Sequence, residues 1–295
     1  MSDYAIRAIS KDKQIRAFAA TTRHLVQELQ SRHQTLPVAS AALGRTATMG
    51  TMLGLTLKEQ NHKLTITVDG DGPLGKIVVD ANGQGDVRGY VDNPAVMGNA
   101  LESYKLNVGE AVGKGTIYVV KDLGLREPYR GTSPIVSGEL GDDFTYYLVS
   151  SDQVPSSVGL GVNVKKEEIL SAGGYMVQVM PEADEDSVQQ LEERISQIES
   201  ISELLKAGIT PEELLYKLLG EDAEILEKHY LRFACKCSRE RTHQMLRSLG
   251  KDEITGILKE LGEAEVVCHF CNEKYQFDAH ELEQMLFEIK RMEAN

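Results

Sequence analysis

The sequence predicts an α+β protein: a mixed N-terminal domain, a helical linker and a small C-terminal domain. Three observations support this prediction. Alternating and helical apolar patterns are interspersed up to about residue 180. An acidic stretch with strong helical periodicity follows. All four cysteines then fall in the last quarter of the chain. We therefore expect domains over residues 1–180, 181–232 and 233–295.

Length and composition fit a globular protein of about two domains, at roughly 100–200 residues each. The chain has 295 residues, 41% of them hydrophobic and 26% charged. It contains no apolar run of signal-peptide or membrane-spanning length, so we expect a cytoplasmic protein. In a reducing compartment, closely paired cysteines are metal ligands or redox sensors more often than permanent disulfides.

Two helices are predicted in the first third of the chain. Residues 11–33 carry apolar side chains at amphipathic spacing, and residues 38–57 are rich in Ala, Met and Leu. The second segment contains Gly44, Gly50 and Gly54, which lower helix propensity but permit close packing.

Strands are predicted next. Apolar and polar residues alternate over 64–68, and 76–80 and 86–91 flank Asn82-Gly83, a pair that favours a type I′ hairpin turn. Further strands are expected in three segments rich in β-branched or aromatic residues, namely 115–121, 145–150 and 175–180.

The acidic linker is predicted to be helical. Apolar residues recur every three or four positions from Ser187 to Leu205, and Thr210, Pro211 and Glu213 have the spacing of a helix N-cap with a capping box. Residues 181–232 hold 5 basic and 14 acidic side chains, a net charge of −9. Such short helices are marginal unless their apolar stripes find a partner, and the acidity disfavours nucleic acid.

The C-terminal domain is predicted to contain helices over 239–249, 252–261 and 279–292, with a strand leading into Cys268 and another over 275–277. About sixty residues with so small a core usually need a metal or a disulfide to fold.

The cysteines predict a zinc site. Cys235 and Cys237 form a C-x-C pair, and Cys268 and Cys271 form a C-x-x-C pair thirty residues later. Four thiolates complete a tetrahedral zinc site, although two disulfides are a chemically exclusive alternative. His243 and His269 are nearby candidates to replace a ligand, but four sulfurs already complete the site. A purely structural zinc site, without switching, is the other interpretation of this motif.

Basic neighbours favour a reactive cluster. Lys236, Arg239 and Arg241 lie near the first pair, and His269 and Lys274 near the second. Positive charge stabilises the thiolate, which is the form that oxidants attack.

The sequence leaves two alternative kinds of function to weigh against this one, a nucleic-acid-binding module and an enzyme. The cationic residues Lys236, Arg239, Arg241 and Arg247 suggest a zinc-containing nucleic-acid or ribosome-associated module, which the overall acidity opposes. A metalloenzyme or thiol oxidoreductase would need an open ligand position, and four sulfurs leave none. The glycines around 70–76 lack the spacing of a phosphate loop, and no catalytic motif is present, so no enzyme is expected.

The chain resembles the 33-kilodalton chaperonin family, the redox-regulated heat-shock holdases of bacteria. The resemblance rests on the spacing of the four cysteines and extends over essentially the whole chain. Further matching segments are Gly70-Asp71-Gly72-Pro73-Leu74-Gly75, Gly83–Val91, Pro128-Tyr129-Arg130-Gly131, Tyr146 and Ser150-Ser151-Asp152-Gln153.

This resemblance implies that the reduced chain carries one zinc ion on Cys235, Cys237, Cys268 and Cys271 and is inactive. It implies that oxidation joins Cys235 to Cys237 and Cys268 to Cys271, and that zinc then leaves. The linker would loosen from the N-terminal domain, and the chain would hold unfolding client proteins as a homodimer without ATP. Neither nucleic acid nor a membrane is implied as a partner.

Overall fold

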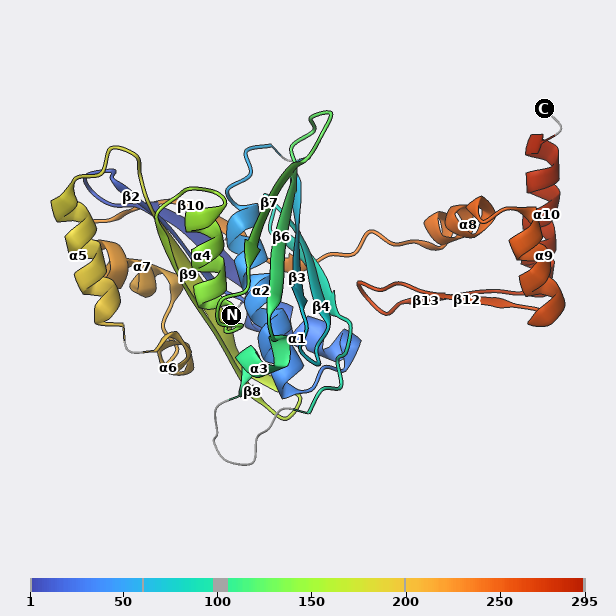
Figure 1. The fold of residues 1–295 in the computed structure, drawn as a ribbon, viewed down its shortest axis with the longest axis horizontal. Helices are drawn as coiled ribbons and strands as arrows, with labels where there is room; N and C mark the ends of the chain where they lie inside the picture. The colour runs from blue at the N-terminus through green and yellow to red at the C-terminus, as the bar shows by residue number, and fades with distance from the viewer. Residues whose placement is uncertain (1, 60, 98–105, 199, 294–295) are drawn as a thin grey trace. The chain divides into compact units, whose positions relative to one another are not determined.

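The computed structural model describes residues 2–59, 61–97, 106–198 and 200–293, and these divide into two compact units (Figure 1). The first unit is Met1–Ala234 and the second is Cys235–Asn295. Strands and helices are mixed in both units, which confirms the predicted α+β class. Among the described residues, no helix is both long and apolar enough to cross a membrane.

The first unit contains two sheets and the helices that pack on them. Its strands are β1 (Tyr4–Ile9), β2 (Ile15–Thr21), β3 (Lys63–Gly70), β4 (Lys76–Asn82), β5 (Asp86–Val91), β6 (Gly115–Asp122), β7 (Tyr129–Pro134), β8 (Ser156–Lys165), β9 (Glu168–Val179), β10 (Glu224–Tyr230) and β11 (Arg232–Phe233). Its helices are α1 (Arg23–His33), α2 (Pro37–Gly54), α3 (Val108–Val112), α4 (Gly141–Ser150), α5 (Glu185–Ser196), α6 (Ile201–Lys206) and α7 (Pro211–Leu219).

One sheet has the strand order β10-β1-β2-β9-β8, and the other has the order β11-β5-β4-β3-β6-β7. All neighbouring strands in these sheets are antiparallel except β11 and β5, which are parallel. The predicted strands over 64–68, 76–80, 86–91, 115–121 and 175–180 all form. Strands β1, β7, β8, β10 and β11 were not predicted.

Helix α2 lies between the two sheets and contacts strands of both, including β4 and β8. Sixteen of its 18 residues are buried, so the helix is covered on every side. A Cβ atom at Gly44 would lie 2.7 Å from Val26 Cγ1, and one at Gly50 would lie 2.9 Å from Val79 Cγ1. Glycine at these positions therefore allows the close packing that the sequence predicted.

Helices α5, α6 and α7 cover the opposite face of the five-stranded sheet (Figure 1). Their buried leucines pack on apolar residues of β1, β2 and β9 in one cluster, which contains Tyr4, Ile6, Ala8, Ile15, Ala17, Ala19, Tyr175, Val177, Leu191, Leu214, Leu215, Leu218 and Leu219. The acidic linker thus has a partner for its apolar stripe. The helix predicted from Ser187 ends at Ser196, and α6 begins only at Ile201.

The predicted start of α7 is confirmed in detail. Thr210 is the N-cap, its hydroxyl accepts the Glu213 N–H at 3.2 Å, and the Glu213 carboxylate accepts the Thr210 N–H at 2.8 Å. Pro211 occupies the first helical turn.

The helix predicted over 11–33 is wrong in its first half. Residues Ile15–Thr21 form β2, paired with β1 on one side and β9 on the other, and the helix begins only at Arg23. Nearly every residue of β2 is buried, because both faces of the sheet are covered. Burial on both faces removes the alternation that would have identified a strand.

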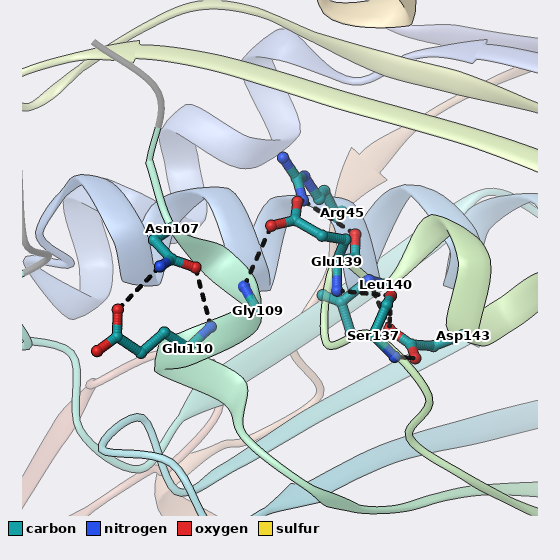
Figure 2. Close-up of polar contacts among 8 residues, drawn as sticks. All are labelled: Arg45, Asn107, Gly109, Glu110, Ser137, Glu139, Leu140 and Asp143. Atoms are coloured by element: carbon teal, nitrogen blue, oxygen red, sulfur yellow. Dashed lines mark hydrogen bonds and ion pairs between the residues drawn. The ribbon is translucent and has the colours of Figure 1, made fainter. Parts of the chain in front are cut away.

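The strand predicted over 145–150 is also wrong, because these residues belong to helix α4. Buried Asp143 organises the start of this helix (Figure 2). Its carboxylate accepts backbone N–H bonds of 2.7–2.8 Å from Val136, Ser137 and Leu140. Phe144, Tyr147 and Leu148 are then buried at helical spacing, a pattern that the aromatic pair at 146–147 obscured.

The hairpin between β4 and β5 forms, but not with the predicted type I′ turn. The positive φ lies at Gly85, at 81°, rather than at Asn82 and Gly83. The Asn82 side-chain oxygen instead accepts the N–H groups of Gln84 and Asp86, at 2.9 and 3.1 Å. An asparagine side chain has thus replaced a backbone group in closing the turn.

The second unit consists of α8 (Arg239–Ser248), α9 (Lys251–Glu260), a hairpin of β12 (Ala264–Val267) and β13 (Lys274–Phe277), and α10 (Ala279–Glu293). These elements match the predicted helices and strands to within a few residues at each end. Its described core is small and consists of Leu246, Ile254, Ala264, Phe277, Leu282, Met285 and Ile289.

Candidate metal centre

The first cysteine pair lies on an extended segment between β11 and α8. Ser238 stops this segment by capping α8, since its hydroxyl accepts the Arg241 N–H at 3.3 Å. Cys235 and Cys237 therefore precede a fixed helix start, and both side chains are half-buried.

The second pair lies on the turn between β12 and β13. The Cys268 N–H donates to the Glu273 carbonyl at 3.0 Å, and the Asn272 N–H donates back to the Cys268 carbonyl at 2.8 Å. Asn272 has a φ of 57°, a left-handed conformation that asparagine adopts more readily than most residues. This tight turn brings Cys271, which is only 5% exposed, round towards Cys268.

The structure brings all four sulfurs together. The Sγ atoms lie within 4.8 Å of one another, with 3.7 Å between Cys235 and Cys268 and 3.3 Å between Cys237 and Cys271. All four residues are thiols rather than disulfides. Four thiolates about 2.3 Å from a central zinc ion lie about 3.8 Å apart. The donor set and its spacing therefore suit a tetrahedral cation that prefers sulfur.

Burial acts against ionisation of the cluster. Desolvation raises the pKa of the Cys271 thiol, and the same effect raises the pKa of Cys237. Without a cation the protein alone thus favours neutral thiols. Metal binding would reverse this preference, because ligation requires thiolates and releases their protons.

The basic residues do not act as the sequence suggested. The Arg239 guanidinium lies 2.7 Å from the Glu281 carboxylate and 4.6 Å from the centre of the Phe277 ring. Lys274 Nζ lies 3.1 Å from the Glu265 carboxylate. Carboxylates thus compensate these two cations, whereas stabilisation of thiolate by Lys236, Arg241 and His269 stays a prediction.

The same pairing weakens the nucleic-acid interpretation. Of its four cationic residues, Arg239 pairs with Glu281 and Arg247 pairs with Glu288 at 3.0 Å. Arg241 donates to the carbonyl of Lys236 at 2.8 Å. Two of these four cations therefore have a compensating carboxylate.

Tyr275 is a contributor that the sequence analysis treated only as a strand residue. Its hydroxyl donates to Cys237 Sγ at 3.2 Å. This hydrogen bond is the main cause that raises the pKa of the Tyr275 hydroxyl. The sequence indicated only that Tyr275 lies on the strand that returns from the second cysteine pair, and not that it contacts a sulfur. Within the described residues, the cluster includes neither His243 nor His269.

Comparisons with known proteins agree with the predicted resemblance. The family model described as "Hsp33 protein" matches residues 3–278. The 33 kDa chaperonin of Bacillus subtilis (strain 168) is 55% identical over 283 residues, which cover 95% of this chain and 97% of that protein. The 33 kDa chaperonin of Geobacillus sp. (strain WCH70) is 52% identical, and the match covers 97% of each chain.

A solved structure is similar along the whole chain. The crystal structure of the 33 kDa chaperonin from Thermotoga maritima, a heat shock protein 33 homologue, matches with a TM-score of 0.91 at 32% identity. The match covers 98% of this chain and 99% of that one. The family predicted from the cysteine spacing is therefore confirmed.

Proposed function

The chain belongs to the Hsp33 family, and we propose that it is a redox-regulated, ATP-independent chaperone that holds unfolding proteins under oxidative and heat stress. It acts by binding rather than by catalysis. One observation carries the proposal: a four-sulfur cluster adjoins, along the chain, an acidic segment that covers an apolar sheet face.

The proposal divides the work among three segments. Residues 1–180 form the chaperone core and the dimerisation domain. Residues 181–232 are the acidic linker, and residues 233–295 are the zinc-binding redox switch. The four cysteines belong to neither apolar core of the first unit, which supports a separate role for residues 233–295.

In the reduced state, Cys235, Cys237, Cys268 and Cys271 hold one zinc ion. When bound, zinc would stabilise four thiolates and cross-link the segment before α8 to the β12–β13 turn. The small core of the second unit needs such a cross-link, because seven buried apolar residues support about sixty residues.

Oxidation joins Cys235 to Cys237 and Cys268 to Cys271. In each pair, the two thiolates lose two electrons as the S–S bond forms, and one hydrogen peroxide molecule takes up these electrons and two protons from the solvent to become two waters. Sulfurs joined in disulfides no longer serve as thiolate ligands, so zinc is released. The cysteines of each pair are separated by one or two residues, and their Sγ atoms lie within 4.8 Å of each other, so the sulfurs of each pair must approach to bonding distance.

Loss of the cross-link loosens the second unit and then the linker. The linker helices α5 and α7 are short, and they bury their leucines chiefly against the five-stranded sheet. Their release would uncover the Tyr4, Ile6 and Val177 face of that sheet, a contiguous apolar surface of the kind that binds other proteins.

Suppression of client aggregation tests the proposal directly. The chain treated with peroxide and mild heat should prevent light scattering by a thermally unfolding client without ATP, whereas the reduced, zinc-loaded chain should not. Equal suppression in both states would contradict redox gating.

The proposed active form is a cytoplasmic homodimer. Sedimentation of the reduced and the oxidised chain, at several concentrations, would detect dimerisation that accompanies activation. A chain that holds clients while remaining monomeric would contradict this part of the proposal.

A further inference from the structure

Strand β10 is the edge strand of the five-stranded sheet, and it comes from the acidic linker. It pairs antiparallel with β1, from Tyr4 opposite Tyr230 to Ile9 opposite Glu224. Strand β1 is otherwise a member of the chaperone core, between β10 and β2. The linker therefore covers an edge of this sheet as well as its face.

Strand β10 is held mainly by its backbone. Its side chains are all exposed or half-buried, and Tyr230 is 68% exposed. By contrast, Tyr4, Ala5, Ile6 and Ala8 of β1 are buried. An edge that is occupied without much side-chain burial recognises extended backbone more than it recognises a sequence.

The side chains and register of β10 also fit this edge imperfectly. The register shifts between Arg7 and Ala8. Lys228 lies opposite Ile6, and its Nζ lies 3.7 Å from the centre of the Tyr4 ring. An apolar side chain in place of Lys228 would extend the apolar cluster around Tyr4 and Ile6. A strand with alternating apolar residues would therefore suit this edge better than β10 does.

The chain neighbours of β10 are α7 on one side and β11 on the other. Four residues separate α7 from β10. After β10, Leu231 is buried in the main core and β11 pairs with β5, and Cys235 lies two residues beyond β11. Lys228 also lies 3.4 Å from the Glu212 carboxylate of α7. Once α7 leaves the sheet face, β10 loses the contact of Lys228 with Glu212. It keeps its pairing with β1, the Arg7–Glu227 ion pair and, at its C-terminal end, the attachment through Leu231 and β11.

We infer that the β1 edge, once β10 has left it, binds extended segments of unfolding polypeptides as an added antiparallel strand. This inference rests on the proposed function and names how the client is held. Backbone hydrogen bonds to β1 would give affinity for many sequences, and the adjacent apolar face would favour segments with alternating apolar side chains.

The register of β10 on β1 shows which backbone N–H groups of an added strand would donate to β1. The Leu231 N–H donates to the Asp3 carbonyl at 3.0 Å. Because backbone groups of alternate residues in a strand point to opposite sides, the N–H groups of Glu227 and His229 face β1. Those of Lys228 and Tyr230 face away from it. Two peptides that carry the same number of N-methyl groups can therefore differ in whether the methylated donors face β1 or face away from it.

The test uses three fluorescent peptides with the sequence of residues 223–231 and the full-length chain. One peptide is unmodified, one is N-methylated at the positions of Glu227 and His229, and one at those of Lys228 and Tyr230. Anisotropy with the oxidised chain should show similar binding of the unmodified and the outward-methylated peptide. The inward-methylated peptide should bind at least tenfold more weakly. The reduced, zinc-loaded chain should bind all three at least tenfold more weakly than the oxidised chain binds the unmodified one.

Competition then separates this inference from the proposed function. Excess unmodified peptide should restore client aggregation in the presence of the oxidised chain, and the inward-methylated peptide should not. Equal binding of the two methylated peptides, by an oxidised chain that still suppresses aggregation, would overturn strand addition alone. Strand addition by clients would also be overturned if no peptide bound because β10 of a second copy occupies the β1 edge in a stable dimer. An oxidised chain that suppresses no aggregation would overturn the proposed function, and with it the inference that client segments bind the β1 edge.

Discussion

The two units of this chain reach a folded state by different means. Among the described residues, the main core of the first unit contains 42 buried apolar residues, and that of the second unit contains seven. The described part of the first unit surrounds a largely buried helix with two sheets, whereas that of the second relies on one hairpin, three helices and a cluster of thiols. We therefore predict that chemistry at the four sulfur atoms loosens the second unit while the first unit keeps its main core.

The linker lies between these extremes. It is acidic and its helices are short, yet it buries a leucine stripe on the sheet and contributes a strand to it. Its stability depends on a partner surface that it covers only while it is folded. A segment of this kind can transmit the state of the weak unit to the strong one.

Removing one sulfur should produce the largest difference between the units. Cys268→Ser should reduce zinc affinity greatly and remove much of the roughly 10–16 kcal/mol that zinc contributes to folding a small domain. Limited proteolysis under reducing conditions should cleave residues 235–295 rapidly, while the first unit keeps its protection.

His269→Ala is the matched control for this prediction. It changes a neighbour of Cys268 but leaves all four sulfurs in place. Zinc content measured by a colorimetric chelator should remain at one per chain. Wild-type zinc content and proteolysis in Cys268→Ser would show that Cys268 is not a ligand.

Loosening the linker without touching the cysteines should give a smaller effect. Leu218→Ala removes a side chain that is buried between α7 and the sheet, at a cost of about 2–5 kcal/mol. Hydrogen exchange should become faster in 185–230 but not in α2, and the reduced chain should acquire part of the holding activity.

Lys217→Ala changes the exposed face of the same helix and is the control. It should leave exchange and activity unchanged. If Leu218→Ala loosened the linker but the reduced chain still held no client, exposure of the sheet face would not be the cause of activity.

A polar contact at the start of α7 should contribute less. The Tyr4 hydroxyl donates to the Glu212 carboxylate at 2.6 Å, and burial, followed by this contact, raises the pKa of Tyr4 so that it stays protonated. Tyr4→Phe should cost about 1.5–3 kcal/mol, the range for hydrogen bonds to charged groups. Exchange at α7 should accelerate accordingly.

Tyr230→Phe removes a hydroxyl from an exposed side chain of the same sheet edge and serves as its control. Equal exchange rates in the two variants would mean that the Tyr4 contact does not hold the linker.

The smallest predicted effect concerns acid. The side-chain amide of Gln14 and the N–H of Ser187 donate to Asp184, and these bonds lower the pKa of its carboxyl. A lowered pKa stabilises the fold above the unfolded value near 4, and this stabilisation is lost as pH falls through the folded value. Exchange at α5 should therefore accelerate below about pH 4.

Asp184→Asn tests whether Asp184 causes the faster exchange at α5 in acid. Asparagine still caps a helix but carries no titrating charge. The variant should show a flatter dependence of α5 exchange on pH between 5 and 3, measured relative to α2 in the same chain. An unchanged dependence would assign the effect to other carboxylates.

The sequence predicted those features that depend on local chemistry. The structure reproduces three features that have local signatures in the sequence. They are the capping box at Thr210 and Glu213, the close C-x-x-C pair at Cys268 and Cys271, and the α2 glycines. Of the elements that it did not predict, strand β2 depends on its pairing with β1 and with the distant β9. Helix α4 was missed although its start is organised locally, by bonds from the N–H groups of Val136, Ser137 and Leu140 to Asp143.

The same distinction applies to the site. The spacing of the cysteines identified the four candidate ligands, because pairs so close in sequence must be close in space. It could not identify Tyr275 or the pairing of Arg239 with Glu281, which arise from the folding of the hairpin onto α8 and α10.

Hydrogen exchange followed by segment, in the zinc-loaded reduced chain and in the peroxide-treated chain, tests the central claim most directly. Zinc released and thiols lost are counted in the same samples. We predict that one zinc leaves as four thiols vanish, and that residues 185–230 and 235–293 lose protection while α2 keeps it. Loss of protection in the second unit alone, with the linker still protected, would contradict the claim that sulfur chemistry controls the sheet face.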